Sequence, residues 1–208
     1  MRKTCIRQVF FFDFMTQASF KTNVLNAILD GAKTYEQTFL TYDYLLISSH
    51  FTLHDSYIIS AEKDNFLHLT GVHTNLSAKE FFDKAIARTL SENDFDFIKS
   101  GQSEAMVKGS VRRKMRFLPI LDKLLQKGTL AEENFTKNKI TCTLAVSENS
   151  FTLGFVMTPH GRPKTLLKGN ELKNFFPLDA IKRRKKGNQI FEKAFYWYQL
   201  AAGKMQEK

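Results

Sequence analysis

The sequence predicts an α+β protein, which combines segments of helical periodicity with pairs of adjacent strands. Residues 16–40 repeat apolar side chains at helical spacing, for example Val24 and Ile28. Residues 139–147 and 151–158 (KITCTLAVS and FTLGFVMT) are rich in β-forming residues and flank the polar turn SENS, which is typical of a hairpin. With 208 residues, 43 % of them apolar, the chain has the size and composition of one domain with its own core.

The first half of the chain contains one long helix, two strands and a second helix. Gly31 lies within the long helix, and we expect it to break or kink the helix. Two short β-rich runs, 43–49 and 55–60, predict strands around a loop. Ser77 and Glu80 have the spacing of a capping box, so a helix is expected to begin there.

The second half begins with a basic helix over about 103–117. Because proline does not fit a helix interior, Pro119 predicts a kink or a new helix start, followed by a piece that runs to Lys127. A third strand is expected at 164–167, antiparallel to the hairpin. An aromatic helix is predicted from about 189 to 203.

The charge is unevenly distributed along the chain. The net charge is +10, but residues 1–100 carry 10 Lys/Arg against 12 Asp/Glu, and residues 101–208 carry 21 against 9. A basic half attached to a nearly neutral half favours a polyanionic partner, with nucleic acid ahead of a membrane surface. The alternative is a soluble protein that is basic for other reasons.

Several classes of protein are disfavoured by the absence of their motifs. There is no phosphate-binding GxxxxGK[ST] loop, no GxGxxG turn, no GxSxG elbow and no clustered acidic set for two metal ions. The two cysteines, Cys5 and Cys142, are too few for a zinc site, and the histidines match no ligand motif. No signal peptide is recognisable, and no apolar run reaches the roughly 20 residues of a membrane span. We therefore expect a cytoplasmic protein with no metal, no cofactor and no membrane partner.

Residues 65–71 (NFLHLTG) are the most informative segment. His68 and Thr70 alternate with apolar residues, and Gly71 allows the backbone to turn. His68 can act as a general acid or base near neutral pH, or it can be a core histidine with a satisfied hydrogen bond. Thr70 can bind a phosphate oxygen or cap the turn, and His73 is expected to be a surface residue.

Cationic side chains form three further groups. In the basic helix Arg112, Arg116, Lys123 and Lys127 would form one stripe if the helix continued past Pro119, or a solvated face. The run Lys182–Lys186 could contact a nucleic-acid backbone or be an exposed loop. The segment 160–169 (HGRPKTLLKG) could clamp a phosphate or be an ordinary basic turn. The residues expected to bind nucleic acid are Arg113, Arg116, Lys123, Arg162, Lys182, Arg183, Arg184 and Lys185.

The order of these segments resembles the phage-associated nucleases of the barnase–EndoU–colicin–RelE group (BECR fold), over about residues 40–170. The matching motifs are N-F-x-H-L-x-G, here NFLHLTG, and P-x-T-L-L, here PKTLL at 163–167. The resemblance implies helices packed on a small twisted antiparallel sheet. We expect one domain over residues 1–208, with this nuclease-like core, an N-terminal helix and a basic C-terminal helical extension.

The resemblance also implies metal-independent RNA cleavage, in which a base activates the ribose 2′-hydroxyl and cations stabilise the pentavalent phosphate. It assigns catalytic roles to His68, Thr70, Arg112, Lys114, Lys164 and Thr165. His68 would be the acid or base, and Arg112 and Lys114 would be electrostatic stabilisers by region only. One departure from this scheme is that no second histidine is placed to complete an acid–base pair.

We therefore expect the protein to be a ribonuclease that serves as a toxin or belongs to a mobile element. An antitoxin or immunity protein is a possible partner. One alternative is a non-catalytic RNA- or DNA-binding protein that uses the basic half of the chain. Another is a structural phage protein whose Phe-rich surface binds a partner, since 20 of the 208 residues are phenylalanine.

Overall fold

The computed structural model describes residues 19–126, 128–137 and 139–196. The helical elements are α1 (Phe20–Tyr35), the π-helical η1 (Glu36–Leu40), α2 (Asn65–Thr70), α3 (Ala78–Ile86), the 3-10 turn η2 (Glu92–Asp94), α4 (Glu104–Met115) and the 3-10 helix η3 (Leu118–Leu125). The strands are β1 (Tyr42–Ile47), β2 (Ser56–Ile59), β3 (Leu130–Lys137), β4 (Ile140–Ser147), β5 (Phe151–Met157), β6 (Gly161–Lys168), β7 (Phe176–Pro177), β8 (Ala180–Lys185) and β9 (Glu192–Tyr196).

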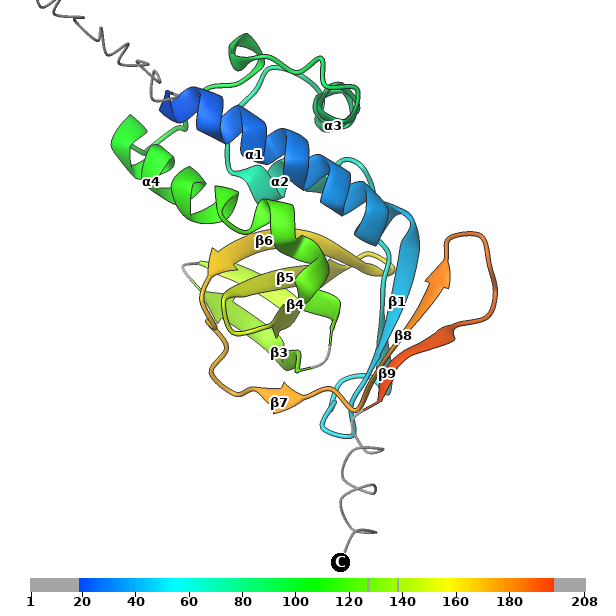
Figure 1. Cartoon of the computed structure of the whole chain (residues 1–208). Coiled ribbons are helices and arrows are strands. Elements are labelled where there is room, and N and C mark those ends of the chain that lie inside the picture. The colour runs from blue at the N-terminus through cyan, green and yellow to red at the C-terminus, as the bar shows by residue number, and fades with distance from the viewer. Residues whose placement is uncertain (1–18, 127, 138, 197–208) are drawn as a thin grey trace, which may run out of the picture.

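The described strands form one curled sheet, in the order β7-β3-β4-β5-β6-β2-β1-β8-β9, with the helices gathered on one side of it (Figure 1). The predicted α+β class is confirmed. The expected small antiparallel sheet is wrong in two respects, because the sheet has nine strands and the β2–β6 pair is parallel. None of the described helices combines the length and apolar character needed to cross a membrane.

The helix α1 begins at a capped residue and is not broken by its glycine. Ser19 Oγ accepts a hydrogen bond from the Thr22 backbone N–H at 3.1 Å, which satisfies one of the free donors of the first turn. The buried face includes Val24 and Ile28. The prediction for Gly31 is wrong. A Cβ at this position would lie 2.7 Å from Leu118 Cβ, so Gly31 permits η3 to pack closely against α1.

The basic helix α4 matches its prediction closely and ends just before the proline. Ser103 caps it by accepting a hydrogen bond from the Met106 N–H, and Val107, Val111 and Met115 form its buried face. The chain restarts as η3, where Pro119 occupies the first turn and Ile120 departs from helical geometry. The cationic stripe from α4 through η3 is therefore interrupted, and Lys127 lies outside the described residues.

The two antiparallel parts of the sheet meet at Gly161. The hairpin of β1 and β2 was predicted, and so was the meander of β4, β5 and β6. These parts meet where Ile59 pairs with Gly161 in parallel and the Ser60 N–H donates to the Gly161 carbonyl at 3.0 Å. A Cβ at Gly161 would collide with the Ile59 side chain and lie 3.2 Å from the Ile58 carbonyl oxygen. The missing side chain thus allows the two parts to approach.

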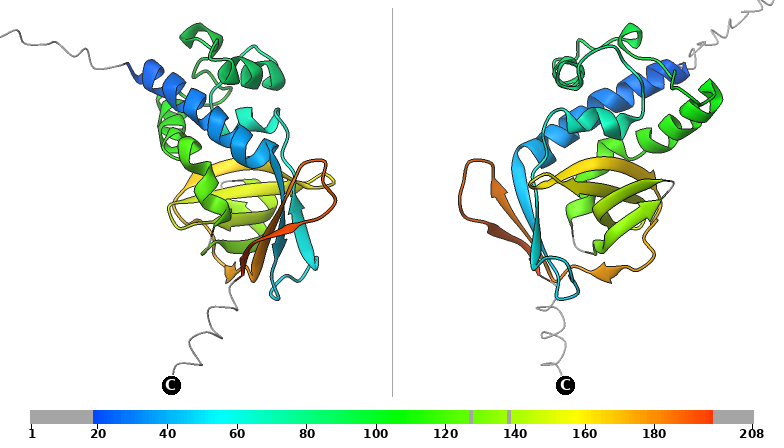
Figure 2. Two further views of the ribbon diagram at one scale, coloured as in Figure 1. Left: turned by 45° about the vertical axis from the view of Figure 1, so that its right-hand side comes forward. Right: turned by 180° about the vertical axis from the view of Figure 1, so that it is seen from behind.

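The C-terminal part differs from its prediction. The run Lys182–Lys186 is mainly strand β8, which pairs with β1, and is not a loop. Glu192–Tyr196 forms strand β9 against β8, so the predicted helix is wrong there, and residues 197–203 lie outside the described part of the chain. Up to Tyr196, the expected helical extension is instead a β-hairpin of β8 and β9 at the edge of the sheet, visible in both views of Figure 2.

Candidate functional site

The segment NFLHLTG forms the short helix α2, which lies over β6 and behind α1 (Figure 1 and Figure 2). Phe66 and Leu69 are fully buried and anchor the helix in the core. Asn65 and His68 are three residues apart, so they lie on the same side of the helix. Gly71 ends α2 in the left-handed conformation, with φ of 79°, as its expected turn requires.

A cleft of about 450 Å³ opens beside α2. Its walls come from α2, the start of β4, the end of β5 and the start of β6. The lining residues are Asn65, His68, Ile140, Val156, Thr158, Arg162, Pro163 and Lys164. The structure therefore brings together three residues that the sequence analysis singled out, namely His68, Arg162 and Lys164.

The two cations of the cleft follow from the geometry of β6. Arg162 lies near the start of this strand and Lys164 lies at a β-bulge in its pairing with β5, and both residues line the cleft. Lys164 is exposed, and its Nζ donates a hydrogen bond to the Thr141 carbonyl at 2.9 Å. An ammonium group has three N–H donors, so two remain for an anionic ligand. Arg162 is partly buried and can offer a planar pair of donors to a phosphate.

Lys114 does not line the cleft but holds α2 from its C-terminal end. Its Nζ donates to the His68 carbonyl oxygen at 3.0 Å, and its stem packs against Gly71. Burial, with a smaller contribution from the positive charge of Lys99, lowers the pKa of Lys114 to about 8. Lys114 therefore contacts the backbone of the histidine and is placed to orient it.

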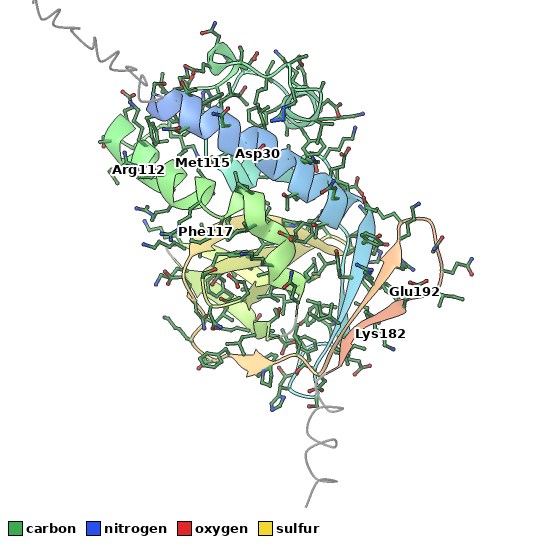
Figure 3. The ribbon with its side chains drawn as sticks, viewed as in Figure 1. Asp30, Arg112, Met115, Phe117, Lys182 and Glu192 are labelled. Atoms are coloured by element: carbon green, nitrogen blue, oxygen red, sulfur yellow. The ribbon has the colours of Figure 1, made fainter. Side chains whose placement is uncertain are left out.

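Besides Lys114, three other predicted catalytic residues lie outside the cleft. Thr70 is fully buried, and its hydroxyl donates to the Leu67 carbonyl at 2.8 Å. Thr165 is also buried, and its side chain lies against Gly154 of β5. Arg112 lies on the flank of α4, where its guanidinium stacks over the Phe20 ring at 5.2 Å (Figure 3).

The residues expected to bind nucleic acid are spread over the surface. Arg113, Arg116 and Lys123 are exposed on α4 and η3. Lys182, Arg183, Arg184 and Lys185 lie on β8, and Figure 3 shows Lys182 at the opposite side of the molecule from Arg112. Two of the β8 arginines are already engaged within the protein. Arg184 forms an ion pair with Asp43 at 3.0 Å, and Arg183 stacks over the Tyr42 ring at 4.8 Å.

Sequence reasoning missed Asn65 and Thr158, which also line the cleft. A signal for Asn65 was present, because it begins the NFLHLTG motif and precedes His68 by one helical turn. Thr158 carries no such signal, since its position depends on the β5–β6 turn. His73 was expected at the surface and is indeed half-exposed, with its Nδ1 3.0 Å from Asp96. Among the described residues, no three His, Cys, Asp or Glu side chains cluster as metal ligands would.

Comparison with known proteins identifies one family. Searches of curated proteins and of solved structures returned no significant match. The model of a family described as phage-Barnase-EndoU-ColicinE5/D-RelE like nuclease 4 matches residues 27–196, a span that contains α2, the cleft and the whole described sheet. The chain therefore belongs to this family of BECR-like nucleases, as the two sequence motifs predicted.

Proposed function

We propose that this protein is a metal-independent ribonuclease that cleaves RNA by transesterification in the α2–β6 cleft. The observation that carries the proposal is the meeting of an exposed imidazole, His68, with two cations, Arg162 and Lys164, in one cleft of a nuclease-family chain. An imidazole can transfer a proton near neutral pH, and cations stabilise the charge that develops at phosphorus.

The composition of the cleft supports chemistry by protein side chains. None of its lining residues is a carboxylate, which is the side chain that Mg²⁺ and Ca²⁺ prefer. The polar lining instead consists of an amide, an imidazole, a hydroxyl, a guanidinium and an ammonium group. This set can hold a phosphate and move a proton, but it offers little to a hard cation.

The reaction follows from these groups. His68 removes the proton from a ribose 2′-hydroxyl, and the 2′-oxygen attacks the adjacent phosphorus. Arg162 and Lys164 bind the non-bridging oxygens, whose negative charge increases in the pentavalent transition state. The bond from phosphorus to the 5′-oxygen breaks, and this oxygen leaves as a hydroxyl with a proton from the protonated groups of the cleft. The products are a 2′,3′-cyclic phosphate and a 5′-hydroxyl end.

The remaining predicted residues take supporting roles. We assign Lys114 to the orientation of His68, because it contacts the His68 carbonyl and not the cleft. Three residues do not line the cleft, and we assign them to the packing of the elements that carry them: Thr70 in α2, Thr165 in β6 and Arg112 in α4. The exposed cations of α4, η3 and β8 would contribute attraction to the RNA backbone.

The proposal is tested by incubating the purified protein with RNA and with DNA in excess EDTA. We expect cleavage of RNA only, and a decrease of at least about 100-fold in kcat/KM for His68→Ala. Lys164→Met should produce a comparable decrease, since it removes one of the charges at phosphorus. His54→Ala is the matched control, because His54 is exposed and does not line the cleft.

Three outcomes would contradict the proposal. Cleavage that stops in EDTA would show that the reaction needs a metal. Cleavage that survives in His68→Ala would exclude His68 as the acid–base group. Intact RNA with tight, salt-sensitive binding would indicate a nucleic-acid-binding protein without catalysis.

A further inference from the structure

The cleft contains more apolar surface than a phosphate site needs. Ile140 from β4, Val156 from β5 and Pro163 from β6 line it beside the polar residues. Ile140 and Val156 are only partly buried, so their side chains still present apolar surface to the cleft. Apolar walls with a few placed polar groups are typical of sites for organic ligands. A phosphate group gains nothing from aliphatic contact, so another part of the substrate has to occupy this surface.

Asn65 adds a fixed hydrogen-bond donor to the same cleft. Its side chain is largely buried, and Oδ1 accepts a hydrogen bond from the Glu62 backbone N–H at 2.9 Å. Because an N–H needs an acceptor, this bond also determines which end of the amide is the oxygen. No acceptor in the described part of the chain binds the Asn65 Nδ2 group, and the residue lines the cleft. An unused NH₂ donor is thus held beside the apolar wall.

We infer that the cleft binds one unpaired nucleobase next to the phosphate that is cleaved, and that the substrate is single-stranded RNA. The flat face of the base lies against Ile140, Val156 and Pro163, and Asn65 Nδ2 donates to an acceptor on the base edge. This inference rests on the proposed function and deepens it.

A nucleobase fits both observations better than other parts of RNA. It combines an apolar face with a polar edge, whereas ribose and phosphate offer no comparable flat surface. Bases in an RNA duplex are stacked and paired inside the double helix, so their faces are not free to pack against the walls of the cleft. Because Asn65 offers a donor, bases with a carbonyl oxygen or an unprotonated ring nitrogen on the presented edge are favoured.

The test uses short DNA oligonucleotides that contain a single ribonucleotide and therefore a single cleavable bond. The base on the 5′ or the 3′ side of that bond is replaced by an abasic residue. We expect one of the two replacements to lower kcat/KM by about tenfold or more, because it removes the base that packs in the cleft. Annealing the intact oligonucleotide to its complement should reduce cleavage to a similar extent.

The matched variant is Asn65→Asp. Aspartate keeps an acceptor for the Glu62 N–H, so the start of α2 is retained, but it replaces the Nδ2 donor with an oxygen. The added negative charge should lower the cleavage of every substrate. The informative quantity is therefore kcat/KM for the intact oligonucleotide divided by kcat/KM for the abasic one. We expect this ratio to fall towards one in Asn65→Asp, because the two changes remove the same interaction.

Binding of fully 2′-deoxy oligonucleotides separates failure of this inference from failure of the ribonuclease proposal. Cleavage that is equal for intact, abasic and duplex substrates would overturn the base site and leave the ribonuclease standing. Absence of any cleavage, with intact strands bound at least about fivefold more tightly than abasic ones, would overturn the ribonuclease and support the base site. Absence of cleavage together with equal binding would overturn both.

Discussion

At the scale of single residues, Lys114 shows how a side chain outside the cleft can control a residue within it. Its ammonium group contacts the His68 carbonyl, which lies in the last turn of α2, where backbone carbonyls have no partner within the helix. Burial nevertheless disfavours its charge and lowers the pKa to about 8. In the proposed ribonuclease, Lys114 would hold the backbone of His68 in place through a charge that burial disfavours.

We expect Lys114→Met to lower kcat/KM without lowering stability at pH 7. Methionine keeps the stem on Gly71 but removes both the donor to His68 and the buried charge. In the wild type, stability should rise between pH of about 8 and 10.5, because there the folded chain has released the proton that the unfolded chain still binds. Chemical denaturation at several pH values should show this rise in the wild type and its loss in Lys114→Met.

Lys108→Met is the control for this prediction. Lys108 lies on the same helix and pairs with Glu104 at the surface, so its replacement should leave the pH profile unchanged. Identical pH profiles for the wild type and Lys114→Met would show that the Lys114 amine is not desolvated.

At the scale of elements, the contact between α1 and η3 depends on Gly31. Replacement by alanine improves helix propensity by about 1 kcal/mol, but it places a Cβ 2.7 Å from Leu118 Cβ. Overpacking of a core costs about 1–3 kcal/mol, so the expected net effect is destabilisation. The control is Gly109→Ala in α4, where the nearest atom, in Arg113, is 3.9 Å away and the gain in propensity should prevail. Thermal denaturation should thus move in opposite directions for the two variants.

The loop between β1 and β2 is fixed to β3 by one carboxylate. Glu133 accepts hydrogen bonds from the Tyr57 hydroxyl at 2.5 Å, from the Thr52 N–H and hydroxyl at 2.8 Å each, and from the Leu53 N–H at 3.2 Å. Burial acts to raise the pKa of Glu133, but these hydrogen bonds outweigh it and hold the pKa below its ordinary value of 4.5. The ionised form therefore stabilises the folded state.

We expect Glu133→Gln to destabilise the protein by about 1–3 kcal/mol at pH 7. Because the pKa is lowered in the folded state, the stabilisation by Glu133 is complete above pH 4.5 and is lost as the pH falls through the folded-state pKa. The difference between wild type and variant should accordingly shrink on acidification, as urea denaturation would show. The exposed Glu36→Gln should give no such pattern, and a difference that is constant with pH would contradict the assignment.

At the scale of the whole molecule, the excess of positive charge extends to α4 and β8 and is not confined to the cleft. Such a distribution attracts a long polyanion and orients it only weakly. The cleft would then select the reacting nucleotide, while the outer cations would contribute affinity.

We expect the double variant Arg183→Gln/Lys185→Gln on β8 to bind RNA more weakly. Removal of one cation that neutralises a phosphate should reduce the slope of log K against log salt by about 0.7 for single strands. The slope of the variant should therefore be shallower by about 1–1.5, measured by fluorescence anisotropy from 50 to 300 mM salt. Lys79→Gln, an exposed lysine on α3, serves as the control. An unchanged slope would show that RNA does not bind to β8.

Local patterns in the sequence predicted a large part of this structure. The periodicity of α1, the serine cap of α3 at Ser77 and the turn between β4 and β5 each depend on residues close together in the chain. Strand β8 was missed because its lysines and arginines have no β-forming pattern. Its conformation comes from pairing with β1, where Arg184 lies opposite Asp43. Strand β3 was missed because its polar residues gave no strand signal, although seven of its residues pair with β4.

The sequence by itself determined the class of fold, the family motifs and the excess of positive charge, and it proposed His68 as a candidate residue of the site. Only the tertiary structure decided which cations meet that histidine. Arg162 and Lys164 line the same cleft as His68, and Arg112 does not, because Gly161 brings β6 beside β2 and so beneath α2. Periodicity and capping depend on residues that are close in the sequence, whereas the convergence of distant segments depends on the register of the whole sheet.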